Sequence, residues 1–106
     1  MTKQTASDNL SRFGEPSILI LLSLSHGPKH GYAMITDIEA ETGIKLGPGT
    51  LYGAIVKLLE KGMIKKVPTT DRRQPYKITE SGTHALQEYV NTWAPIIQLG
   101  QRRLAV

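Results

Sequence analysis

Side chains that could bind phosphate groups gather in two neighbouring segments of the sequence, residues 48–61 and 71–74. Lysine and arginine pair with phosphate oxygens, hydroxyl groups donate hydrogen bonds to them, and glycine lets another backbone come close. The candidate binding residues among them are Thr50, Tyr52, Gly53, Lys57, Arg72 and Arg73. The competing interpretations are a solvated turn for the two arginines and a tyrosine packed along the first helix for Tyr52.

The other reactive side chains form no catalytic or metal-binding pattern. His26, His30 and His84 lack ligand spacing with one another or with carboxylates, and there is no cysteine. The sequence also lacks a nucleophile elbow, a phosphate-binding glycine loop and a paired-carboxylate cleft. We therefore predict a protein that is not an enzyme and has no catalytic residue, metal site or cofactor. Two of the histidines flank Gly27-Pro28, which predicts a structural role for them.

Length and composition predict one small folded domain. The chain has 106 residues, of which 40% are hydrophobic and 21% charged, and its net charge of +4 favours a polyanionic partner. No apolar run approaches the roughly 20 residues that cross a bilayer, and the polar N-terminus is unlike a signal peptide. These features predict a cytoplasmic protein without membrane contact. Residues 1–10 are predicted to form a disordered tail.

Residues 48–61 are expected to form a helix with one apolar face. Pro48 suits the first helical position, and Gly62 suits the position just past the end. At 100° per residue, the expected core side is Leu51, Ile55, Leu58, Leu59 and Gly62. The expected outer side is Gly49, Gly53, Val56, Lys57 and Glu60. Gly53 is either a bare surface for close approach of a partner or simply a tolerated glycine.

The segments on either side of this helix predict a winged helix-turn-helix. Two helices are expected before it, one starting at Pro16 and one running from Gly31 to a cap at Gly43. A short turn at residues 44–47 joins the second helix to the third. After it, residues 63–67 and 76–79 predict a hairpin whose tip carries the arginines.

Residues 80–106 predict one long helix with an apolar stripe along its length. The stripe is Leu86, Tyr89, Val90, Trp93, Ile97 and Leu104. Pro95 predicts a kink near residues 91–95, because proline removes one backbone hydrogen bond. The stripe is longer than a small domain can cover, which predicts a homodimer through this helix. Trp93 either anchors that dimer or offers a flat surface to a small ligand.

The chain resembles the PadR family of bacterial transcriptional regulators over roughly residues 12–90. The matching elements are Arg12 with Gly14, His30-Gly31-Tyr32, Gly49-Thr50-Leu51-Tyr52, the run from Leu58 to Ile64 and the run from Tyr76 to Gly82. The resemblance implies a winged helix-turn-helix that dimerises through a C-terminal helix and usually represses transcription. Some relatives are released from DNA by phenolic or other apolar compounds. The short C-terminal region resembles the compact branch, with a single dimerisation helix.

Taken together, we expect a mainly α fold with a small β-hairpin wing. The expected divisions are a tail at 1–10, a winged helix-turn-helix at 11–79 and a dimerisation helix at 80–106. The expected partners are double-stranded DNA, a second copy of the chain and a small aromatic or apolar effector that binds near Trp93. The expected function is sequence-specific DNA binding at a pseudo-palindromic operator, with repression of transcription. The alternative is a winged-helix module for protein–protein assembly, which Glu60 and Asp71 within the expected DNA surface favour.

Overall fold

A computed structural model describes residues 15–105 of the chain. The predicted tail at 1–10, together with Arg12 and Gly14, lies outside the described residues. The elements in chain order are α2 (Glu15–Leu24), β1 (Lys29–His30), α3 (Gly31–Thr42), α4 (Pro48–Glu60), β2 (Ile64–Lys66), β3 (Pro75–Ile78) and α5 (Glu80–Leu104). Within the described range, no helix is both long enough and apolar enough to span a bilayer. The types and order of these elements confirm the predicted mainly α fold with a small β wing.

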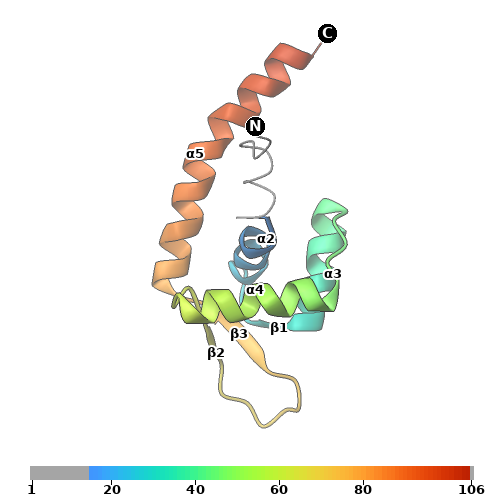
Figure 1. Ribbon diagram of the computed structural model, residues 1–106, viewed down its shortest axis with the longest axis vertical. Helices are drawn as coiled ribbons and strands as arrows, with labels where there is room; N and C mark the ends of the chain where they lie inside the picture. Colours follow the sequence, from blue (N-terminus) through green and yellow to red (C-terminus); the bar gives the residue numbers. More distant parts are fainter. Residues whose placement is uncertain (1–14, 106) are drawn as a thin grey trace, which may run out of the picture.

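The three helices α2, α3 and α4 enclose the core. Ile20 of α2, Met34 of α3, and Leu51 and Ile55 of α4 are almost completely buried and belong to one cluster. In Figure 1, α4 crosses α2 and α3 stands to one side, while the wing projects below and α5 rises on the other side. This packing leaves one long face of α4 open.

Local residue chemistry sets the ends of these helices. His30 caps α3, because its Nδ1 accepts a hydrogen bond of 3.3 Å from the Ala33 N–H. Gly43 ends α3 with φ at 76°, and its N–H donates to the Glu39 carbonyl. Pro48 is the first residue of α4, and Gly62, with φ at 72°, turns the chain away after it. Gly62 is exposed, so it ends the helix without joining the expected core side.

The wing belongs to a three-stranded sheet, whereas the sequence predicted only a hairpin. The strand order is β1-β3-β2, and both pairings are antiparallel. In β1, Lys29 faces Tyr76 and His30 faces Pro75, while in β2 Lys65 faces Lys77. The sheet therefore ties the start of α3 directly to the wing.

The beginning of α5 is fixed to the end of α4. Thr79 is the N-cap of α5: its Oγ1 accepts from the Gly82 N–H and donates to the Gly62 carbonyl. Its N–H donates to the Met63 carbonyl at 3.0 Å. A side chain on Gly82 would collide with that same carbonyl and with Ile78. Close packing therefore explains why glycine stands at this position.

The second part of α5 extends away from the rest of the molecule. The helix has 25 residues and continues through Pro95. Its contacts within the chain are mainly with α2 and β3. Figure 1 shows its axis changing direction partway along, as the backbone hydrogen bond lost at Pro95 predicts.

Candidate nucleic-acid interface

The outer face of α4 is exposed, and Gly53 leaves the middle of this face without a side chain. Thr50, Gly53 and Lys57 are all exposed on this face and line a shallow hollow beside the start of α2. A Cβ added at Gly53 would meet no atom within 4 Å. The hollow therefore lets another molecule approach the α4 backbone closely.

The two wing arginines are exposed on a loop that is braced from within. The Asp71 N–H donates to Thr69 Oγ1, and Asp71 Oδ1 accepts from the Arg72 N–H at 3.0 Å. Gln74 Nε2 donates to the carbonyls of Val67 and Pro75 across the base of the loop. In the described part of the chain, the cations in ion pairs are Lys29, Lys45 and His84, and neither Arg72 nor Arg73 is among them. Both guanidinium groups are thus available to an anionic partner.

A groove of about 230 Å³ separates α4 from the wing. We call it the tyrosine groove, and it is lined by His30, Gly31, Tyr32, Tyr52, Arg72, Arg73, Gln74 and Tyr76. It brings together three of the six predicted site residues, namely Tyr52 and the two arginines. The other three line the hollow on α4. The predicted residues therefore form two adjoining patches joined by α4.

Tyr32 is an exposed residue of the tyrosine groove and is not among the six predicted site residues. Its side chain is exposed in the first turn of α3. The sequence indicates the His30-Gly31-Tyr32 run only through the family resemblance, and nothing in its spacing predicts that it lines a groove with the wing arginines. The signal that could have found it is the pairing of β1 with β3, which the sequence does not reveal.

Tyr52 affects the titration of Tyr76, another of the three tyrosines that line the groove. Tyr76, on β3, is only 8% exposed. Burial raises the pKa of the Tyr76 phenol, and the nearby Tyr52 phenol raises that pKa further. The Tyr76 hydroxyl is therefore uncharged at neutral pH, so it adds no negative charge beside the arginines.

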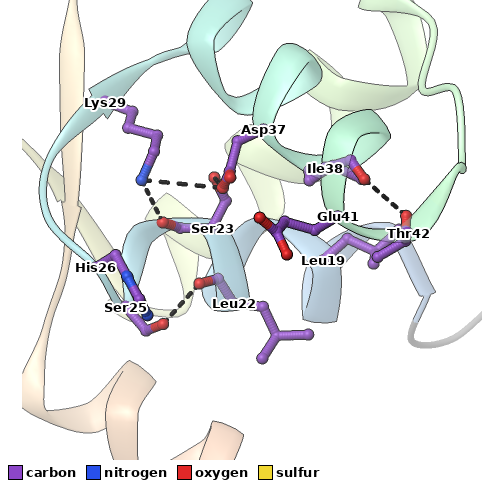
Figure 2. Close-up of a pocket in the computed structure, with 10 residues that line it drawn as sticks. All are labelled: Leu19, Leu22, Ser23, Ser25, His26, Lys29, Asp37, Ile38, Glu41 and Thr42. Carbon is purple, nitrogen blue, oxygen red and sulfur yellow. Dashed lines mark hydrogen bonds and ion pairs between the residues drawn. The ribbon is translucent and has the colours of Figure 1, made fainter.

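A second groove, between α2 and α3, contains a network of hydrogen bonds among Ser23, Lys29 and Asp37 (Figure 2). Lys29 Nζ donates to the Ser23 carbonyl at 2.6 Å and lies 3.9 Å from Asp37 Oδ2, which also accepts from Ser23 Oγ. This network joins α2, β1 and α3. Within the described residues, no group of three or more histidines and carboxylates could hold a metal ion. The arrangement suits structural bracing better than catalysis.

The predicted stripe on α5 divides into buried and exposed residues. Leu86 is buried in the chain's own core, so it is not part of the exposed surface expected for a dimer contact. Tyr89 and Trp93 are half-buried, with ring centroids 6.2 Å apart and an interplanar angle of 41°. The exposed large apolar residues of α5 are Val90, Ile96, Ile97, Leu99 and Leu104. Ile96 and Leu99 widen the stripe beyond the residues that the sequence projection selected.

Comparison with known proteins places this arrangement among transcriptional regulators. The model of the "Transcriptional regulator PadR-like family" matches residues 20–88. A 37.1 kDa protein of transposon Tn4556 from Streptomyces fradiae is 35% identical over 83 residues, which cover 78% of this chain and 24% of that protein. The chain thus spans about a quarter of the length of this relative.

Solved structures have the same fold. A PadR family transcription regulator from Clostridium difficile has a TM-score of 0.75 at 25% identity, with 87% of this chain and 100% of that chain covered. A transcriptional regulator from Clostridium thermocellum has a TM-score of 0.76 at 24% identity, with coverages of 94% and 98%. The fold similarity therefore extends over most of each chain.

Proposed function

Because the chain belongs to the PadR-like family of transcriptional regulators, we propose that it binds double-stranded DNA through α4 and the wing. Members of this family are transcriptional regulators and not enzymes. The observation that carries the proposal is the position of two exposed, unpaired arginines beside the open face of α4. In this proposal the tyrosine groove and the hollow on α4 face the same duplex.

In this proposal α4 is the recognition helix and enters the major groove. Thr50, Gly53 and Lys57 lie nearest the DNA, and Gly53 lets the helix backbone approach it closely. Arg72 and Arg73 hold the adjacent phosphate backbone or minor groove. Phosphate contacts then fix the position of the helix, and side chains on α4 read the bases.

The proposed active species is a homodimer joined through α5. The apolar residues on the second part of α5 are exposed in the single chain, and an exposed patch of this kind favours association. Two-fold symmetry predicts a pseudo-palindromic operator with half-sites about 10–10.5 base pairs apart, or a multiple of that spacing. Repression follows if the dimer covers a promoter, and it would act in the cytoplasm, where bacterial DNA lies.

Trp93 has two alternative roles, and the first is an effector site between the two subunits. The ring of Trp93 is half-buried and tilted against Tyr89, so an aromatic face is available to a planar apolar compound. Binding there would alter the angle between the subunits and release the DNA. A Trp93 that only fills the dimer contact is the competing role, and it is the one that we favour.

The proposal is tested by fluorescence anisotropy with a duplex from the region upstream of the protein's own gene. We expect that duplex to bind more tightly than a scrambled duplex of the same length and composition, with two chains per duplex. If the folded protein binds neither duplex at low salt, a protein–protein module becomes the better interpretation. Glu60 is the residue that favours this second function, because it places a carboxylate at the exposed end of α4. Asp71 places a second carboxylate within the expected DNA surface, where its Oδ1 accepts from the Arg72 N–H.

A further inference from the structure

The Tyr52 side chain lies directly against the backbone of Gly31. A Cβ added at Gly31 would be 2.7 Å from Tyr52 Cζ and nearer still to the Tyr52 hydroxyl oxygen. It would also lie 3.1 Å from Cδ2 of Leu51, a side chain that is fully buried in the core. Glycine is therefore the only residue type at position 31 that leaves the Tyr52 phenol where it is.

The contact between Tyr52 and Gly31 lies at the base of the wing. Gly31 directly follows β1, in which His30 faces Pro75 and Lys29 faces Tyr76 on β3. The Tyr52 phenol also lies close enough to the Tyr76 phenol to raise its pKa. One side chain of α4 thus touches the start of α3 and lies beside the central strand of the sheet.

We propose that Tyr52 is a positioning residue that sets the wing at a fixed distance and angle from the recognition helix. Arg72 and Arg73 line the same groove as Tyr52, and in this proposal the position of Tyr52 determines where those guanidinium groups meet the DNA relative to α4. The inference rests on the DNA-binding function proposed above. It differs from the sequence expectation, in which the Tyr52 hydroxyl itself contacts a phosphate.

The exposure of Tyr52 is consistent with this role. The side chain is 47% exposed although its hydroxyl is against Gly31, so the exposed part includes ring surface. A ring that supports neighbouring residues works through its bulk, and removing the hydroxyl leaves most of that bulk in place. A hydroxyl that donates to DNA works through one atom, and phenylalanine would abolish that contact.

The test compares four variants for their affinity for a fluorescein-labelled 30-base-pair duplex across a range of salt concentrations. They are Tyr52→Phe, Tyr52→Ala, Gly31→Ala and the double variant Gly31→Ala/Tyr52→Ala. Circular dichroism and thermal unfolding check that each is folded. If Gly31→Ala folds poorly, Tyr52→Ala still tests the proposal, because Tyr52 is half-exposed. The variant Arg72→Ala/Arg73→Ala is the reference. It shows how duplex affinity depends on salt when the wing arginines do not contact DNA.

We expect Tyr52→Phe to keep the wild-type affinity and salt dependence. Tyr52→Ala and Gly31→Ala should each weaken binding and make the plot of log affinity against log salt shallower, toward that of the arginine variant, by about 0.9 per lost phosphate contact. Gly31→Ala should cause a much smaller loss in the Tyr52→Ala background than in the wild type, because the Tyr52 side chain is gone and only the contact with Leu51 remains.

Two results would overturn the inference while wild-type DNA binding persists. One is a loss of about tenfold in Tyr52→Phe, the size expected for a lost hydrogen bond to phosphate. The other is Tyr52→Ala with the affinity and salt dependence of the wild type. A wild-type protein that binds no duplex would instead refute the proposed function, and the inference with it.

Discussion

Leu86 and Val90 lie one turn apart on the same face of α5, yet Leu86 is 7% exposed and Val90 is 45% exposed. Leu86 packs into the core formed by α2, α3 and α4, whereas Val90 lies where the body of the domain no longer covers the helix. A single apolar stripe therefore has two roles. Its first turns hold α5 to its own domain, and the later turns remain available to a partner.

Leu86→Ala should destabilise the fold of each chain. Removing a buried leucine side chain costs about 2–5 kcal/mol, because apolar contacts are lost and a cavity remains. The free energy of unfolding is measured by urea denaturation at several protein concentrations.

The matched change is Ile97→Glu, at an exposed position of α5. It should dissociate the dimer in analytical ultracentrifugation and leave the helical circular dichroism signal in place. Intact wild-type protein sedimenting as a monomer at micromolar concentration would contradict the dimer.

Trp93→Ala should weaken the dimer. If the indole fills the subunit contact, its removal costs on the order of 3–5 kcal/mol of association free energy. Sedimentation equilibrium measures that change. Trp93 is the only tryptophan in the chain, so its fluorescence also reports directly on compounds that bind beside it. A planar aromatic compound that quenches this fluorescence and lowers DNA affinity, while Trp93→Ala still dimerises normally, would instead establish the ligand site.

Gly53→Ala should stabilise the protein and weaken its binding to DNA. Alanine is favoured over glycine within a helix by about 1 kcal/mol, and the added methyl group would meet no atom of the chain. The same methyl group would project from the face that is proposed to enter the major groove. Urea denaturation and duplex anisotropy on one preparation measure both effects. Unchanged affinity would mean that the glycine is merely tolerated.

The helix boundaries could be predicted because their causes are local. Pro48, Gly43 and Gly62 each act through the backbone conformation of their own position, which sequence alone reveals. The strand β1 has only two residues and exists through its pairing with β3. Such a short segment has no alternation to detect, so the third strand of the sheet was missed.

The site could be predicted only in part, for a similar reason. The outer face of α4 follows from helical periodicity, and the arginines follow from their place in a turn. The role of Gly31 depends on Tyr52, a residue of another helix, and no pattern within either segment links the two. Periodicity likewise predicts an apolar stripe on α5, but it could not show that Leu86 is buried in the core of the chain whereas Val90 is exposed.

The central claim is that the wing and α4 together bind DNA, and the salt dependence of duplex affinity tests it most directly. The measurement compares the wild type with Arg72→Ala/Arg73→Ala and with Arg102→Ala/Arg103→Ala, an equal loss of charge at the far end of α5. We predict a steep fall of log affinity with log salt for the wild type, and a slope shallower by about 0.9 for each wing arginine that loses a phosphate. The α5 variant should keep the wild-type slope. Equal slopes for the wild type and the wing variant would contradict the account.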